Sequence, residues 1–202
     1  MKILHSMNKP DIGGIQNFVV ELAIHQKNKG HDVSILLNSL NGEYRFRLKE
    51  NNINIIQSYV NSGYDIRPKK IFNLKTIYKD FDIIHFHTFS LIHFLALNKK
   101  KIIYTMHGLS KGVRQENFIK SYFRESLKYF FLNRVNFFVA NSSYTMNCSI
   151  RDYGLKRNRK KVVLNGTKIK QIISSEYDIE KEFVIGLVSR FTKRKKIERL
   201  IK

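Results

Sequence analysis

Short apolar runs alternate with helical patterns along the chain, and this alternation constrains the fold more than any other feature. The apolar runs lie at residues 2–6, 33–37, 53–56, 82–87, 101–106, 136–140 and 161–164. Segments with helical periodicity lie between them, at 15–29, 70–79, 89–98, 115–133 and 143–152. Strands that are apolar on both sides and alternate with helices indicate an α/β fold, a parallel sheet with helices on both faces.

A polar, irregular stretch separates this pattern from a second, shorter one. Residues 183–188 begin a new apolar strand, and residues 197–202 begin an amphipathic helix. A lone strand and a short helix cannot bury their own apolar surface. We therefore expect a first domain over residues 1–166, a linker over 167–182, and the start of a truncated second domain over 183–202.

The residues that follow each strand are the candidate site, because open α/β sheets bind ligands at the carboxyl ends of their strands. Gly13 and Gly14 open the first helix, where glycine lets a phosphate approach backbone N–H groups; a plain turn is the alternative. His87 ends the fourth strand and is predicted to line the cleft, whereas His85 is expected to be a core histidine. His107 ends the fifth strand, where an imidazole can hydrogen-bond a substrate hydroxyl.

Later strand ends add polar and basic side chains. Asn141 and Ser142 follow the sixth strand and Asn165 follows the seventh, with a helix N-cap and a simple turn as the respective structural alternatives. Arg190 follows the eighth strand, and Lys195 comes shortly after it, a pair suited to a diphosphate. A solvated basic helix start is the alternative, but positive charge there opposes the helix dipole, which favours a bound anion.

The sequence contains histidine and aspartate residues of the kind that bind metals, but their positions argue against a metal site. His85 and His87 point to one face of a strand, yet no acidic or cysteine cluster follows to complete a ligand set. Asp80 and Asp82 spell an Asp-x-Asp motif typical of metal–diphosphate sites, but they precede their strand. They are therefore expected at the edge opposite the cleft, and we expect neither a metal nor another cofactor.

Composition and charge narrow the class of protein further. Hydrophobic residues make up 43% of the 202 residues, which excludes a disordered or collagen-like chain. The net charge is +21, with 14 basic and 8 acidic side chains over residues 1–100 and 23 and 8 over residues 101–202. Such a charge favours anionic partners: nucleic acid, an acidic membrane or a phosphate-bearing small molecule. The single cysteine, Cys148, and the lack of a signal-peptide pattern predict a cytoplasmic protein.

The order of the motifs is more specific than any one of them. The chain resembles glycosyltransferase family 4 in the series Gly13-Gly14-Ile15-Gln16, Asp82-Ile83-Ile84-His85-Phe86-His87, Thr105-Met106-His107-Gly108, Val139-Ala140-Asn141-Ser142-Ser143, Val163-Leu164-Asn165-Gly166 and Ile185-Gly186-Leu187-Val188-Ser189-Arg190-Phe191. The resemblance implies a GT-B enzyme, with two Rossmann-like domains around a cleft. This chain would hold the N-terminal, acceptor-side domain and the first strand of the C-terminal domain.

The resemblance also implies an activity and a role for each matching residue. It implies retaining transfer of a sugar from a nucleotide-sugar donor to a cell-surface glycan or lipid-linked acceptor, as in polysaccharide biosynthesis, without a metal. His107 would be the catalytic residue that contacts the transferred sugar, and Gly13, Gly14, Arg190 and Lys195 would bind the donor. The cleft or its acceptor side would be lined by His87, Asn141, Ser142 and Asn165. The family's Glu-x7-Glu motif is missing, so we expect no turnover from this chain alone.

Two questions about partners stay open. The helix over residues 115–133 mixes aromatic and basic side chains, which is typical either of packing on the sheet or of binding anionic lipid on the inner face of the cell membrane. The charge also permits a nucleic-acid-binding module, although no helix-turn-helix, zinc-finger or RNP-type pattern supports one. An inactive remnant is the third interpretation. We expect a nucleotide sugar, a glycan or lipid-linked acceptor and an anionic membrane surface as partners, and no nucleic acid.

Overall fold

The computed structural model describes residues 1–97, 101–108, 118–155, 159–166, 186–188 and 197–198. The chain divides into two compact units, Met1–Gly166 and Thr167–Lys202. Nearly all described residues belong to the first unit.

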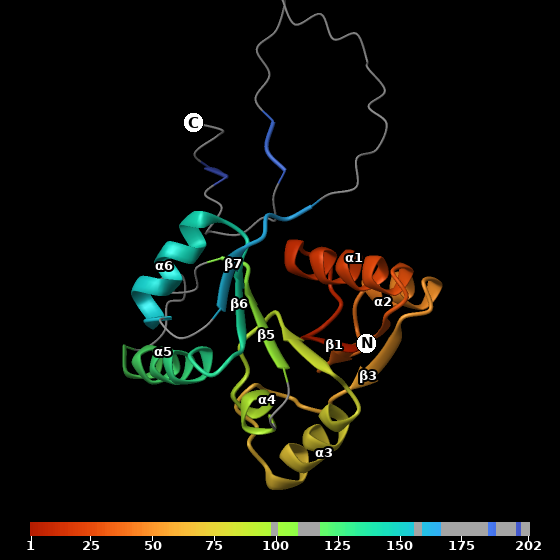
Figure 1. The fold of residues 1–202 in the computed structure, drawn as a ribbon, viewed down its shortest axis with the longest axis horizontal. Coiled ribbons are helices and arrows are strands. Elements are labelled where there is room, and N and C mark those ends of the chain that lie inside the picture. The colour runs from red at the N-terminus through yellow and green to blue at the C-terminus, as the bar shows by residue number, and fades with distance from the viewer. Residues whose placement is uncertain (98–100, 109–117, 156–158, 167–185, 189–196, 199–202) are drawn as a thin grey trace, which may run out of the picture. The chain divides into compact units, whose positions relative to one another are not determined.

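The first unit alternates strands and helices throughout. In chain order its elements are β1 (Lys2–Met7), α1 (Gly14–Asn28), β2 (Asp32–Leu37), α2 (Tyr44–Glu50), β3 (Asn54–Gln57), α3 (Pro68–Lys79), β4 (Ile83–Phe86), α4 (Leu91–Leu95), β5 (Lys101–Met106), α5 (Phe118–Leu132), β6 (Phe137–Ala140), α6 (Ser143–Tyr153) and β7 (Arg159–Val162). The strands form one parallel sheet in the order β3-β2-β1-β4-β5-β6-β7. This confirms the predicted Rossmann-like α/β fold (Figure 1).

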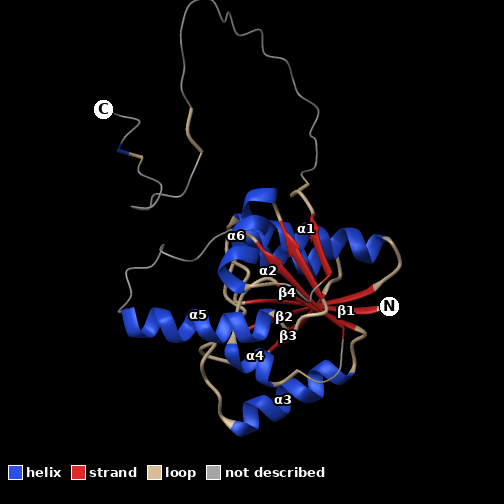
Figure 2. Ribbon diagram, turned by 60° about the vertical axis from the view of Figure 1, so that its left-hand side comes forward, coloured by secondary structure: helices blue, strands red, loops and turns tan. Residues whose placement is uncertain are grey.

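Successive side chains along each strand point to opposite faces of the sheet, and both faces are apolar. In β1, Leu4 joins a core cluster with residues of α3, α4, α5 and α6, whereas Ile3 and Met7 join a second cluster with residues of α1 and α2. Each face therefore has its own set of covering helices, which lie on both sides of the strands (Figure 2). Burial on both faces explains why the central strands are apolar almost throughout.

Local signals set several helix ends. Pro68 begins α3, where its fixed backbone dihedral is preorganised for a helix and its missing N–H costs nothing. Ser142 caps α6, because its Oγ accepts a hydrogen bond from the backbone N–H of Thr145 at 3.1 Å. Gly154 ends α6 in the left-handed conformation, with φ of 55°, that glycine adopts at little cost.

Some elements differ from the sequence-based expectation. Helix α2 lies in a segment for which no helix was predicted. Strand β7 spans Arg159–Val162 rather than 161–164, because pairing with β6 rather than apolar content sets its register. In the second unit, Gly186, Leu187 and Val188 are exposed and lie in no strand; the rest of the predicted strand and the predicted linker lie outside the described residues.

Within the described ranges, no helix combines the length and the apolar character needed to cross a bilayer.

Candidate functional site

Four histidines lie at or near the carboxyl edge of the sheet, on or directly after three adjacent strands, β1, β4 and β5. His5 lies in β1 directly beside His85 of β4 in the parallel register. His87 follows β4, and its backbone N–H donates to the carbonyl of Ser6 at 3.3 Å, so it continues the strand pairing. His107 comes directly after Met106, the last residue of β5. The fold thus brings together four histidines from three separate segments of the sequence.

Three of these imidazoles, those of His5, His87 and His107, form a continuous hydrogen-bonded chain on the face of the sheet covered by α1. His107 Nε2 lies 3.0 Å from His87 Nδ1, and His87 Nε2 lies 3.1 Å from His5 Nδ1. His5 Nε2 lies 2.7 Å from Oε1 of Gln26 on α1. His85 stands outside this chain and pairs through Nε2 with the hydroxyl of Thr105 at 2.7 Å. His85 is therefore a buried histidine with its own polar partner.

Burial keeps these imidazoles neutral. His5 is fully buried, and burial lowers the pKa of its imidazole to about 4 despite the opposing hydrogen bond with Gln26. Burial lowers the pKa of His107 to about 4 as well. The pKa values of His85 and His87 fall well below the ordinary range, first through burial and then through the neighbouring histidines. At neutral pH the site therefore offers hydrogen-bonding imidazoles rather than fixed positive charge.

The N-terminal turn of α1 reaches the same edge. The ring of Phe18 lies edge-on to His107, with ring centroids 5.0 Å apart, and 6.0 Å from the ring of His87. Gly14 begins this helix, and a Cβ added to it would meet no atom within 4 Å. No acidic side chain occupies the first turn. A Cβ added to the preceding Gly13 would lie 2.6 Å from Oε1 of Gln16, so the Gln16 side chain lies close to this end of the helix. A helix N-terminus without acidic side chains is a position that favours an anion.

The structure places three further predicted site residues, Asn141, Ser142 and Asn165, in different settings. Asn141 follows β6, and its Nδ2 donates to the carbonyl oxygen of His107 at 3.3 Å. Its Oδ1 is the one buried side-chain polar atom without a hydrogen-bond partner among the described residues. The Ser142 hydroxyl is engaged as the N-cap of α6. Asn165 is exposed and stands three residues beyond the end of β7, so the expectation that it directly follows the strand is wrong.

The two basic residues predicted to bind a diphosphate cannot be placed at this edge. Arg190 and Lys195 lie outside the described residues. Their role stays a prediction from the sequence.

The histidines also raise the question of a metal. His5, His85 and His87 can each offer a nitrogen within 4.8 Å of the others, and they are the one such group within the described part of the chain. Sequence reasoning missed His5 as the third member. However, the nitrogens of His5 and His87 that face each other are within hydrogen-bond distance. Neutral imidazoles therefore satisfy one another there without an ion.

The Asp-x-Asp motif lies away from this site. Asp82 directly precedes β4, and its carboxylate accepts a hydrogen bond from the backbone N–H of Lys2, the first residue of β1, at 2.8 Å. Both residues mark the amino ends of their strands, so the motif is at the opposite edge of the sheet from His107.

Three site residues had no sequence signal of their own: His5, Gln26 and Phe18. Only the strand order, which puts β1 beside β4, reveals that His5 shares a face with His85 and His87. Because alternate residues of a strand share one face, comparing the residues on the same face of β1 and β4 would have found His5 once that strand order was assumed.

Comparison with solved structures agrees with this architecture. HepE from Anabaena, in complex with UDP-glucose, superposes with a TM-score of 0.61 at 17% identity, over 83% of this chain and 44% of that one. A glycosyltransferase from Rickettsia africae gives a TM-score of 0.57 at 20% identity, over 81% and 42%. Sucrose-phosphate synthase from Thermosynechococcus elongatus gives 0.53 at 11% identity, over 82% and 48%. This chain thus spans less than half the length of these proteins, and at such identities the likeness shows the shared fold.

Sequence comparison identifies the family. No curated protein sequence matches the chain. The family model for Glycosyltransferase Family 4, however, matches residues 12–171, most of the chain, including α1 and its glycines, the β4 and β5 histidines and Asn165. The chain therefore belongs to glycosyltransferase family 4.

Proposed function

We propose that this chain is the acceptor-side domain of a retaining glycosyltransferase that moves a sugar from a nucleotide donor to a cell-surface glycan or lipid-linked acceptor. The observation that carries the proposal is the position of His107. It directly follows β5 at the carboxyl edge of the sheet, in ring contact with Phe18 of α1. The family match and the nucleotide-sugar complex of HepE support a donor of that class.

The chemistry proposed for this edge is electrostatic and hydrogen-bonding. The N-terminus of α1 would face the leaving diphosphate, where its N–H groups and dipole favour negative charge. For Arg190 and Lys195, which lie outside the described residues, we propose only the role that the resemblance implies, which is to bind the donor diphosphate. His107 would hydrogen-bond a hydroxyl of the transferred sugar. We expect the transfer to need no metal, as the resemblance to the family implies.

Titration with UDP-glucose, the ligand named in the HepE complex, tests this proposal. We expect millimolar UDP-glucose to perturb the NMR signals of His107, Gly13 and Gly14 in the purified chain. His107→Ala should weaken binding about tenfold, as expected for the loss of about 1.4 kcal/mol. His25→Ala, on the exposed side of α1, is the matched control and should bind like the wild type.

Two results would overturn the proposal. One is the absence of any perturbation at these three positions with the nucleotide sugar. The other is saturable, salt-sensitive binding of duplex DNA by a chain that ignores nucleotide sugars, which would favour the nucleic-acid-binding interpretation instead.

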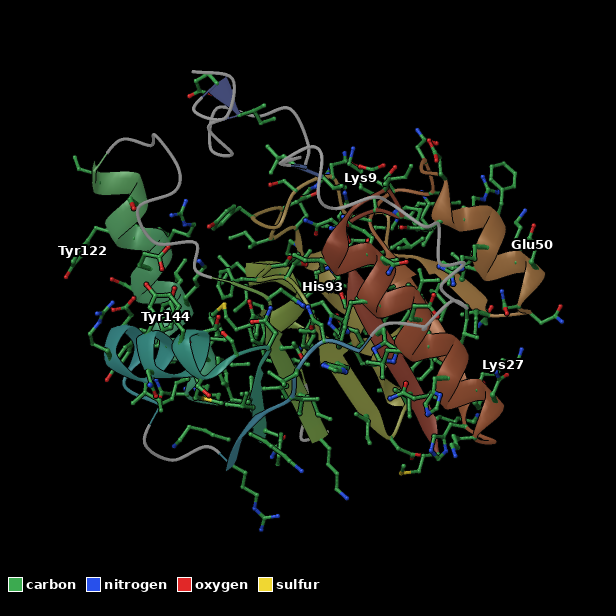
Figure 3. The ribbon with its side chains drawn as sticks, turned by 90° about the horizontal axis from the view of Figure 1, so that it is seen from above. Lys9, Lys27, Glu50, His93, Tyr122 and Tyr144 are labelled. Carbon is green, nitrogen blue, oxygen red and sulfur yellow. The ribbon has the colours of Figure 1, made fainter. Side chains whose placement is uncertain are left out.

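A second proposal concerns location: we propose peripheral binding of α5 to an anionic membrane surface on the cytoplasmic side. The burial pattern of this helix supports it. Leu127, Phe131 and Leu132 pack on the sheet, but Tyr122 and Phe123 are 70% and 61% exposed. Figure 3 shows Tyr122 pointing away from the sheet. Aromatic side chains on an outer face, on a chain with net charge +21, suit an interface with anionic lipid.

Vesicle co-sedimentation tests the membrane proposal. We expect binding to anionic vesicles that weakens with added salt, and a clear loss in the double variant Tyr122→Ser/Phe123→Ser. The matched control is Phe46→Ser/Phe72→Ser, which removes two rings that are 70% and 69% exposed on α2 and α3. Equal binding to neutral and anionic vesicles, unaffected by salt, would contradict the proposal.

A further inference from the structure

We propose that Gln26, acting through His5 and His87, fixes the proton of His107 on Nε2, so that Nδ1 of His107 is left as a hydrogen-bond acceptor for a sugar hydroxyl. The assignment of the proton rests on the hydrogen-bond chain alone. Its use on a sugar rests on the proposed function. Gln26 and His5 would be positioning residues, because neither lies at the strand-end position where the substrate is proposed to bind.

The polarity of the chain follows from counting protons. A neutral imidazole has one N–H donor and one lone-pair acceptor, and the Gln26 Oε1 atom can only accept. Because Oε1 lies 2.7 Å from His5 Nε2, that nitrogen carries the proton of His5 and its Nδ1 is an acceptor. The nitrogen 3.1 Å from that acceptor, Nε2 of His87, must then donate.

The same reasoning carries through to the end of the chain. With its proton on Nε2, His87 has an acceptor at Nδ1, and His107 Nε2 lies 3.0 Å from it. His107 must therefore donate from Nε2. One amide oxygen on α1 thus determines which nitrogen of His107 is free to accept, three hydrogen bonds away.

Burial makes this arrangement rigid. His5 and His87 are 0% and 3% exposed, so water cannot replace a mismatched hydrogen bond in the middle of the chain. An added proton would turn one imidazole into a double donor and place two N–H groups face to face. His107 is the least buried of the three rings. The end of the hydrogen-bond chain at which the ligand is proposed to bind is therefore the end that meets solvent.

Neighbouring contacts hold the terminal ring in place. Phe18 packs edge-on against His107 and against His87. Asn141 holds the His107 carbonyl oxygen through its Nδ2. A ring fixed in position and in tautomer presents one defined acceptor, which selects for a hydroxyl group, since hydroxyls can donate.

A ligand-free NMR measurement tests the proton assignment directly. The ring nitrogens of a histidine have distinct ¹⁵N signatures when protonated and when bare. In the wild-type chain near pH 7 we expect His5, His87 and His107 all to be protonated on Nε2 and bare on Nδ1. The His107→Gln variant assigns the signals of that ring.

Two substitutions at Gln26 separate a polarity-setting role from a merely structural one. Gln26→Glu keeps an acceptor and should keep Nε2–H on His107. Gln26→Lys replaces the acceptor by a donor and should move the proton of all three rings to Nδ1. Gln16→Lys is the matched control, because Gln16 is also on α1 but takes no part in the hydrogen-bond chain. It should leave the protonated nitrogen of His107 unchanged.

The outcomes that overturn the proposal are specific. A wild-type His107 protonated on Nδ1 would show that the chain runs in the opposite direction. An unchanged His107 in Gln26→Lys would show that Gln26 does not set it. Stoichiometric Zn²⁺ binding that shifts His5, His85 and His87 together would make the cluster a metal site. None of these measurements uses a nucleotide sugar, so they can fail while the proposed transferase function stands.

Discussion

At the scale of single residues, the buried histidines contribute to the way in which acid lowers the stability of the protein. His5 in the folded state takes up a proton only near pH 4, whereas an unfolded histidine does so near pH 6.5. Between these values the unfolded state binds more protons than the folded state. The contribution of His5 to the free energy of unfolding is therefore fully present above pH 6.5 and is lost as the pH falls toward 4. Each pKa unit corresponds to about 1.4 kcal/mol, which makes the contribution of His5 roughly 3 kcal/mol.

Urea unfolding at a series of pH values checks this prediction. We expect the loss of stability between pH 6.5 and pH 4 to be smaller in His5→Gln than in the wild type. His25→Gln, at an exposed position on α1, should keep the wild-type slope. Identical slopes in all three proteins would show that His5 is not held neutral by the fold.

Two glycines at the site edge should respond in opposite ways to alanine. Gly14→Ala should leave stability unchanged or raise it by up to about 1 kcal/mol, because its Cβ meets open space and alanine favours helix. It should still weaken UDP-glucose binding if the diphosphate approaches the helix backbone closely. Gly108→Ala should cost about 1–3 kcal/mol because φ is +151° there, a conformation that residues with a Cβ rarely adopt. Thermal unfolding and ligand titration measure both effects.

At the scale of elements, the start of α6 depends on one serine. Ser142→Ala should destabilise the protein by about 1 kcal/mol, since it removes the acceptor of the Thr145 N–H. Ser143→Ala changes an exposed residue of the first turn that caps nothing, so it should be nearly neutral. Chemical denaturation of both variants decides between them; equal losses would mean that the cap contributes little.

The elements also show how far sequence reasoning reaches. Strands β1, β2, β4 and β5 carry apolar runs because both of their faces are largely buried, and β6 is apolar with one face buried and one half-buried. The sequence pattern located each of these five strands within one or two residues. Among the described strands, β7 pairs only with β6, and it contains Arg159, Lys160 and Lys161, so its apolar signal is weak and misplaced. Helix α2 buries a single residue, Leu48, and its short span carries too little periodicity to detect.

At the scale of the whole molecule, stability depends on the larger of the two apolar clusters. Phe86 of β4 is fully buried there, with its ring stacked 5.1 Å from Phe94 and edge-on to Tyr78 at 6.3 Å. Phe86→Ala should cost about 3–5 kcal/mol, because it removes buried apolar surface and leaves a cavity. Phe72→Ala, at a ring that is 69% exposed, should change stability by less than about 0.5 kcal/mol. Denaturant midpoints with unchanged m-values would establish both numbers.

The sequence by itself determined the α/β fold, the family and the polar residues that follow β4, β5 and β6. It could do so because burial on both faces and strand-end position leave local traces in residue order. Only the tertiary structure decided which strands are neighbours. That order brought His5 beside His85 and placed Gln26 and Phe18 of α1 over the same face. The hydrogen-bonded chain to His107 joins residues more than eighty positions apart, and no pattern in a linear sequence records such a contact.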